Sequence, residues 1–333
     1  MRNSHKISML VAIVAIVCSF SGCKKDENSA NSIKGDVYVA GFELNTATYW
    51  KNGVKVALTD ESSFGVARSI AVTGDDVYVA GYVSKGAGNT IATYWKNGTA
   101  VALTDGLKNT WTKSIAVSDN DVYIAGDGYE TNSDKSVAKY WKNGTVVALS
   151  DGTRDAFTTS ITVVGNDVYV AGNAINKYGK NVAIYWKNGI EVVLDSGELG
   201  AFATSIIVIG NDVYVAGYVV KNYKNVATYW KNGTAVALDN GLNDTYAYSI
   251  AVAGTDVYVA GFDMSVAKYW KNGTLIALND GTKPERTTSI AVVGRDVYVA
   301  GYDYIVAKYW KNGVAVSLTD GTKSACAFSI VVK

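Results

Sequence analysis

The sequence predicts an all-β protein built from seven similar four-stranded units. Four short words recur in a fixed order: "DVYVAG", "YWKNG", a "VAL"-like word and a "SIAV"-like word. Successive "DVYVAG" words begin 40, 45, 46, 45, 44 and 40 residues apart. A repeat of about 40–45 residues with four strands is typical of a propeller blade. We therefore expect a seven-bladed β-propeller with four antiparallel strands per blade.

The first word of each unit is rich in Val, Tyr and Ala and ends at Gly, which indicates a strand followed by a turn. The Asp that opens this word is expected to bind turn amides, as Asp often does in tight turns. The word begins at Asp36, Asp76, Asp121, Asp167, Asp212, Asp256 and Asp296.

The second word ends a strand and opens a hairpin. Asn-Gly is the strongest short hairpin signal, because a type I′ turn needs positive φ at both central residues. The Trp residues of this word are expected to lie in the core. The word begins at Tyr49, Tyr94, Tyr140, Tyr185, Tyr229, Tyr269 and Tyr309.

The third and fourth words complete each unit. The third word ends at Leu58, Leu103, Leu149, Leu194, Leu238, Leu278 and Leu318. The fourth word starts at Ser69, Ser114, Ser160, Ser205, Ser249, Ser289 and Ser329. No word shows a clean apolar/polar alternation, which indicates sheets covered on both faces. In the usual meander order the "SIAV" strand is innermost, and its Ser is expected to hydrogen-bond between inner strands.

The folded region does not begin and end at the points of the repeat that would bound one sheet. The repeats start on a "DVYVAG" word and stop on a "SIAV" word at residues 329–333. In a ring, the last strand would pair with the first "DVYVAG" strand and complete its blade, which removes open sheet edges. We therefore predict a ring closed by the C-terminal strand.

The unit as a whole resembles the WD-repeat and related secreted bacterial propeller repeats over residues 36–333. The Gly-His and Trp-Asp signatures of true WD repeats are missing, so properties of that subfamily are not transferred. The core "A-x-Y-W-x-N-G-x-x-x-x-L" is also similar to the bacterial HAF-type repeat, over a shorter stretch.

The N-terminus is typical of a targeting segment. Arg2 and Lys6 precede an apolar run over residues 7–20, which is shorter than the roughly 20 residues that span a bilayer. The following "SGC" resembles a bacterial lipobox, although Phe20 departs from its usual aliphatic residue. The resemblance implies a lipoprotein signal peptide over residues 1–22 and lipidation of Cys23. The polar linker is predicted over residues 23–35 and the propeller over 36–333; the alternative is an ordinary secretory signal.

The "KKDE" stretch after Cys23 looks like the signal that sends some Gram-negative lipoproteins to the cell surface. Several acyl chains would anchor the protein stably, so the predicted location is the outer membrane, with membrane contact only through the lipid. The chain has 31 basic and 30 acidic residues, and two basic ones lie in the signal, so the mature charge is close to neutral. No nucleic-acid partner is expected, and we expect a monomer.

Comparison of the seven copies indicates where a ligand would bind. The turns within "YWKNG" and after "SIAV" hardly vary, whereas the other two connections of each blade vary and share the opposite rim. The positions three and one residues before the repeated Ser vary most and should surround the mouth of the central channel. Aromatic, Arg and Lys residues there suit sugars, carboxylates or peptides. The predicted binding residues are Arg68, Trp111, Lys113, Phe157, Phe202, Tyr246, Tyr248, Arg286 and Phe328. The alternative is that they are hydrophobic plugs and solvated charges.

The residues available for catalysis are few. The single His, His5, lies in the signal, and Cys326 has no partner for a disulfide. The mature chain therefore lacks Ser-His-Asp, Cys-His and imidazole metal sites. We predict no catalytic residues, no cofactor and no metal site, although calcium binding by loop Asp and Asn oxygens stays open. Carboxylate pairs for glycoside hydrolysis would have to come from the loop acids Glu130, Asp134, Asp263 and Asp303.

These observations favour a surface-anchored binding protein whose ligand is an extracellular glycan or protein held at the variable rim. Two other classes stay open. One is a His-independent polysaccharide lyase or hydrolase, and the other is a purely structural or adhesive module.

Overall fold

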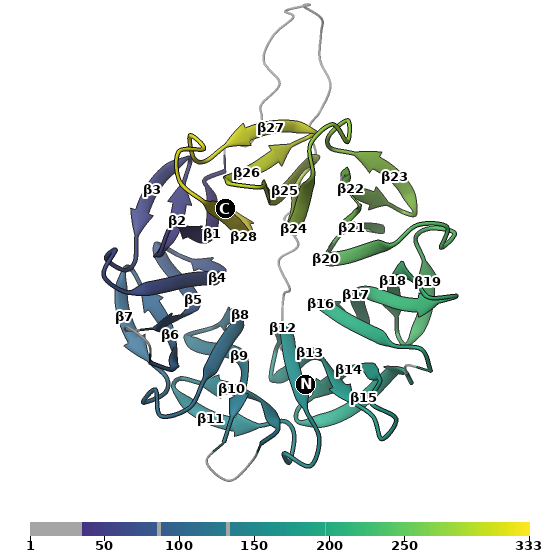
Figure 1. The fold of residues 1–333 in the computed structure, drawn as a ribbon, viewed down its shortest axis with the longest axis horizontal. Helices are drawn as coiled ribbons and strands as arrows, with labels where there is room; N and C mark the ends of the chain where they lie inside the picture. Colours follow the sequence, from purple (N-terminus) through teal and green to yellow (C-terminus); the bar gives the residue numbers. More distant parts are fainter. Residues whose placement is uncertain (1–34, 85–87, 131–133, 197, 265) are drawn as a thin grey trace, which may run out of the picture. The chain divides into compact units, whose positions relative to one another are not determined.

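Twenty-eight strands joined by turns make up the described part of residues 35–333 (Figure 1). The computed structural model describes these residues except 85–87, 131–133, 197 and 265. The predicted signal peptide (1–22), Cys23 and almost all of the linker (23–35) lie outside the described residues. No helix long and apolar enough to cross a bilayer occurs in the described residues. Seven four-stranded antiparallel sheets surround a common axis, so the predicted β-propeller is confirmed.

In each sheet the strands follow the predicted order from the axis outward. The innermost strands are β4 (Phe64–Thr73), β8 (Thr110–Ser118), β12 (Ala156–Val164), β16 (Ala201–Ile209), β20 (Thr245–Ala253), β24 (Glu285–Val293) and β28 (Ala325–Val332). The second strands are β1 (Val37–Glu43), β5 (Asp76–Ser84), β9 (Asp121–Tyr129), β13 (Asp167–Ile175), β17 (Asp212–Lys221), β21 (Asp256–Asp263) and β25 (Asp296–Asp303). The third strands are β2 (Thr46–Lys51), β6 (Thr90–Lys96), β10 (Ser136–Lys142), β14 (Asn181–Lys187), β18 (Lys224–Lys231), β22 (Val266–Lys271) and β26 (Val306–Lys311). The outermost strands are β3 (Val54–Ala57), β7 (Thr99–Ala102), β11 (Thr145–Ala148), β15 (Ile190–Asp195), β19 (Thr234–Ala237), β23 (Thr274–Ala277) and β27 (Val314–Ser317).

The C-terminal strand closes the ring. One sheet has the order β28-β1-β2-β3, so its innermost strand comes from the other end of the chain. Ile330 lies opposite Val39 in this antiparallel pair. The backbone N–H of Lys333 donates to the carbonyl of Asp36 at 3.0 Å. The predicted closure is therefore confirmed.

The core lies between the sheets. Seven clusters of buried residues each combine side chains from two neighbouring sheets, which explains why no strand alternates between apolar and polar. The Trp of every "YWKNG" word is at most 2% exposed, as predicted. One cluster joins Val39 and Trp50 to Ile330, so closure also completes a hydrophobic interface.

The rim that carries the "YWKNG" turns is the same in every blade. Each turn places Asn at φ of about 50° and Gly at φ of about 82°, the geometry of the predicted type I′ hairpin. In the first blade, the side-chain oxygen of Asn52 accepts a hydrogen bond from the N–H of Val37 at 2.9 Å. The Asn52 amide donates to Asp36 at 2.8 Å, and the Lys51 ammonium lies 3.0 Å from the same carboxylate.

The repeated Asp residues therefore bind side chains, and our interpretation that they bind turn amides was wrong. The Asn hydrogen bond and the Lys beside it lower the pKa of Asp36. The same Asn, not the Asp, satisfies the backbone N–H at this turn. This arrangement recurs in the other six blades.

The repeated Ser residues join neighbouring inner strands, as predicted. The Oγ of Ser69 accepts from the N–H of Ile115 in the next blade at 3.2 Å. The Oγ of Ser329 accepts from Ile70 at 3.4 Å, so the bond also bridges the closing strand. These contacts tie the inner strands together around the axis.

Candidate functional site

Every inner strand contains a β-bulge one residue before the repeated Ser. In β4, Ala67 lies opposite Gly81 and Ser69 lies opposite Ala80, so Arg68 is the extra residue. The same shift occurs in the other six inner strands. A bulge bends the strand and redirects the extra side chain. The seven bulge residues are Arg68, Lys113, Thr159, Thr204, Tyr248, Thr288 and Phe328.

The Gly that ends each "DVYVAG" word makes room for this bulge. A Cβ on Gly81 would lie 2.0 Å from the carbonyl oxygen of Val66 and 2.9 Å from the Trp95 ring. A Cβ on the equivalent Gly of the other six blades would lie 1.8–2.4 Å from the corresponding carbonyl. Only glycine permits this close backbone approach.

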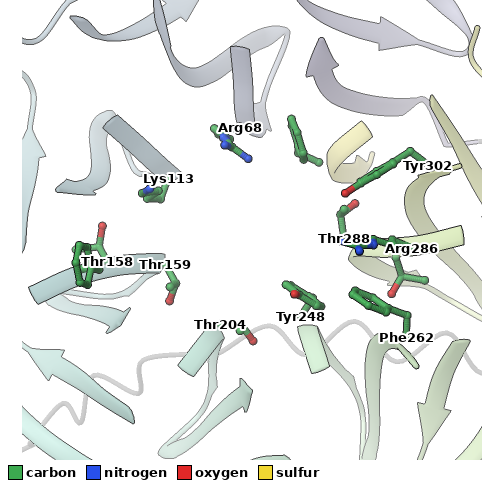
Figure 2. A pocket seen from close by; sticks show the side chains of 13 residues that line it. Arg68, Lys113, Thr158, Thr159, Thr204, Tyr248, Phe262, Arg286, Thr288 and Tyr302 are labelled. Carbon is green, nitrogen blue, oxygen red and sulfur yellow. The ribbon is translucent and has the colours of Figure 1, made fainter. Parts of the chain in front are cut away.

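The bulge residues meet in a cavity of about 510 Å³ at the axis (Figure 2). All seven line it, one from each blade. The other lining residues are Phe157, Thr158, Phe262, Arg286, Thr287 and Tyr302. The volume falls within the roughly 300–1,000 Å³ of ligand pockets. In Figure 2, Arg68, Lys113, Thr204 and Tyr248 surround one open space, although they come from blades far apart in the sequence.

The structure brings six of the nine predicted binding residues into this cavity. They are Arg68, Lys113, Phe157, Tyr248, Arg286 and Phe328. The other three, Trp111, Phe202 and Tyr246, are not among the lining residues. Trp111 packs edge-on to Tyr129 with centroids 6.3 Å apart, and Phe202 stacks on Tyr218 at 4.6 Å. Whether any of the nine binds a ligand stays a prediction.

Other lining residues were not selected from the sequence. Phe262 and Tyr302 directly follow "DVYVAG", and Thr158 and Thr287 lie two residues before the repeated Ser. The position after "DVYVAG" does vary between copies, which was the available signal. It holds Phe42, Tyr82, Asp127, Asn173, Tyr218, Phe262 and Tyr302.

Two arginines of the cavity lie against aromatic rings. The Arg68 guanidinium lies 4.5 Å from the centroid of the Phe328 ring and 5.8 Å from that of Tyr82. The Arg286 guanidinium lies 4.9 Å from the centroid of Phe262. Phe262 in turn stacks on Tyr248, with centroids 5.3 Å apart and planes 9° apart. Burial raises the pKa of Tyr248, so this ring keeps its hydroxyl proton near neutral pH.

The third cation of the cavity has an acidic neighbour. The Lys113 ammonium lies 3.8 Å from a carboxylate oxygen of Asp127, whose side chain is 2% exposed. Burial raises the pKa of Asp127, and the positive charge of Lys113 opposes this shift. Asp127 also accepts a hydrogen bond from the N–H of Thr158 at 3.2 Å, which connects two neighbouring blades.

The loop acids considered for hydrolysis lie elsewhere. Three of them form ion pairs with lysines of the third strands that are at most 9% exposed, and none of the four lines the cavity. The pairs are Glu130 with Lys139, Asp263 with Lys268, and Asp303 with Lys308. Asp134 is exposed. The cavity is therefore lined by cations, aromatic rings and hydroxyls.

No cluster of three or more metal-binding His, Cys, Asp or Glu residues occurs in the described part of the chain. Cys326 is a free thiol on the closing strand. Burial raises its pKa to about 11, so the thiol form prevails at neutral pH.

Comparison with known proteins identifies the fold but no family. No protein-family model and no curated protein matches this chain. A puromycin-hydrolysing peptidase from Mycobacterium tuberculosis matches 86% of the chain with a TM-score of 0.57 and 12% identity. A structure from a study of two prolyl endopeptidases matches 90% with a TM-score of 0.52 and 11% identity. The chain spans about half the length of both, 52% and 50%. At this identity the likeness shows the shared propeller fold alone.

Proposed function

We propose that this protein binds an extracellular ligand, a glycan or a protein, in the cavity at the axis of the propeller. The observation that carries the proposal is the set of seven bulge residues. Each blade contributes one, and they converge on a single cavity of about 510 Å³.

The chemistry of these residues supports a binding role. The Gly opposite each bulge and the Ser after it are the same in all seven blades. The bulge residue itself is Arg, Lys, Thr, Tyr or Phe. A structural role repeated by symmetry would be expected to need the same residue each time. Different side chains on a rigid, repeated frame are typical of a site that recognises one asymmetric ligand.

The N-terminal residues support a cellular location for the proposed binding. A signal peptide over residues 1–22, lipidation at Cys23 and the charged residues that follow would anchor the protein at the outer face of the outer membrane. The linker would then connect the lipid-bearing Cys23 to the propeller, and the lipid would be the only contact of the protein with the membrane. An extracellular ligand fits this location.

Binding is tested with the full chain, purified in detergent, on a panel of bacterial and host glycans and surface proteins. We expect saturable binding of one class. Tyr248→Ala should weaken it by about tenfold or more, because this ring lines the cavity and aromatic contacts dominate binding energy. Tyr178→Ala is the matched control, since Tyr178 is 74% exposed and does not line the cavity.

Two outcomes would contradict the proposal. Release of a reaction product during the assay would show an enzyme. Equal loss of binding in the two tyrosine variants, or no loss in either, would place the ligand outside the cavity. Labelling of Cys23 with a radioactive fatty acid, lost in Cys23→Ser, tests the anchor separately.

A further inference from the structure

All three charged side chains that line the cavity are cations: Arg68, Lys113 and Arg286. We propose that the cavity binds an acidic saccharide, and that Arg68 and Arg286 bind the carboxylate groups of its uronic acid units. The inference rests on the proposed binding function and specifies the chemical class of the ligand.

The two arginines have no acidic partner within the described residues. Their surroundings contrast with those of Arg154, which makes two hydrogen bonds of 2.6 Å to the carboxylate of Glu191. The Nε atom of Arg68 is buried and has no hydrogen-bond partner among the described residues. A guanidinium left unpaired in a partly enclosed site favours an anionic ligand that supplies the missing acceptors.

The aromatic rings hold both guanidinium groups in place. The Arg68 guanidinium lies 4.5 Å from the centroid of the Phe328 ring, and the Arg286 guanidinium lies 4.9 Å from that of Phe262. A cation–π contact uses none of the N–H donors of a guanidinium, so its terminal N–H groups can still donate to a ligand. Figure 2 shows the nitrogen atoms of Arg68 extending toward the open space. A planar carboxylate can accept two parallel hydrogen bonds from the edge of a guanidinium.

The remaining lining favours a saccharide over an acidic peptide. Residues that carry hydroxyl groups line the cavity from several blades, among them Thr159, Thr204, Tyr248 and Tyr302. The Thr204 hydroxyl lies 3.0 Å and 2.9 Å from two backbone carbonyl oxygens, which share its single proton, and it keeps its acceptor capacity. Sugar hydroxyls can pair with groups of this kind because they both donate and accept.

One backbone donor on the edge of most inner strands is already bonded, which makes addition of a peptide strand less favourable. In six of the seven blades, the N–H of the residue after the repeated Ser already donates to a Ser of the preceding blade. Strand addition requires unpaired backbone groups along an edge. Recognition by side chains is therefore favoured at this end of the axis.

The test is isothermal calorimetry on the full chain in detergent. The probes are oligogalacturonate, its methyl ester, oligomannuronate, the carboxyl-reduced form of oligomannuronate, and a glutamate oligomer. We expect saturable binding of a uronate, weakened by about tenfold or more when its carboxylates are esterified or reduced. Arg68→Gln and Arg286→Gln should each weaken it to a similar extent. Arg68→Lys should retain part of the affinity, because it keeps the charge but loses the bidentate edge.

Arg295→Gln is the matched control, since Arg295 is an exposed arginine in the turn between β24 and β25 and does not line the cavity. Near-ultraviolet circular dichroism checks that each variant is folded. Equal binding of the ester and the acid, lost in Tyr248→Ala but not in the arginine variants, would overturn this inference and leave the proposed function standing. Arginine-dependent binding of the glutamate oligomer alone would also overturn it, as would no binding of either uronate.

Discussion

The glycine that ends each "DVYVAG" word determines what the neighbouring inner strand presents at the axis. Without a Cβ, Gly217 allows the carbonyl of Phe202 to approach closely, and the strand bulges at Thr204. The bulge then directs Thr204 into the cavity. A repeated glycine and a variable residue on the neighbouring inner strand therefore act together, although Gly217 and Thr204 are 13 positions apart in the sequence.

Replacement of this glycine tests the arrangement. In Gly217→Ala, the new Cβ would lie 1.8 Å from the Phe202 oxygen and 2.9 Å from the Trp230 ring, so both strands must shift. We expect a loss of roughly 1–3 kcal/mol in the free energy of unfolding, measured by denaturant titration. Thr234→Ala, at an exposed position on β19 of the same blade, should change it by less than about 0.5 kcal/mol. A Gly217→Ala variant as stable as the parent would contradict the account of the bulge.

The third strand of each blade carries a buried position whose residue differs between blades. It is Lys in three blades, and each Lys is paired with acids close by. In the other blades the position is Thr or Ile. Lys308 lies 2.7 Å from both Glu285 and Asp303. Burial tends to lower the pKa of Lys308, but its hydrogen bonds to Asp303 and Glu285 outweigh this effect and raise the pKa.

The residues of other blades suggest the substitutions that test the ion cluster of Lys308, Glu285 and Asp303. Lys308→Thr should cost about 3–5 kcal/mol in the free energy of unfolding, because two largely buried carboxylates lose their counterion. The triple variant Lys308→Thr, Asp303→Val, Glu285→Ala copies the residues of the blade that contains β16, which has Thr228, Val219 and Ala201 at these positions. It should recover most of that loss, since a buried ion pair replaced as a whole is often close to neutral. If the triple variant is no more stable than the single one, the cluster does more than satisfy its own charges.

At the scale of the whole molecule, stability depends on the pairing of β28 with β1. This pair holds the two ends of the propeller together, and it completes the hydrophobic cluster that contains Val39, Trp50 and Ile330. Every other sheet consists of strands consecutive in the sequence. The sheet β28-β1-β2-β3 therefore joins the parts of the propeller that are farthest apart in the sequence.

Deletion of residues 325–333 tests this closure. It removes an innermost strand, exposes the edge of β1 and uncovers apolar side chains of the cluster. Loss of Ile330 alone corresponds to about 2–5 kcal/mol. We expect the thermal unfolding midpoint to fall by roughly 10 °C or more. Lys333→Ala, which keeps the backbone N–H that donates to Asp36, is the control, and an unchanged midpoint after the deletion would contradict a closed ring.

Much of the fold could be predicted because its determinants are local and repeated. The Asn-Gly turns, the order of the four words and the offset of the last word all lie within short stretches of sequence. The cavity was predicted only in part. The bulge positions were among those identified by variation, whereas Phe262 and Tyr302 were missed because they reach the cavity from the neighbouring strand. Trp111, Phe202 and Tyr246 had the right chemistry, but their rings pack against adjacent aromatics, which a linear sequence does not reveal.

The sequence by itself determined the number of blades, the order of strands within each blade and the strand that closes the ring. Each of these follows from the repeated order of four short words and from the word on which the repeats start and stop. Only the tertiary structure decided which variable side chains share one cavity. That choice depends on the bulge opposite each glycine and on which ring stacks on which, and both arise from contacts between paired strands.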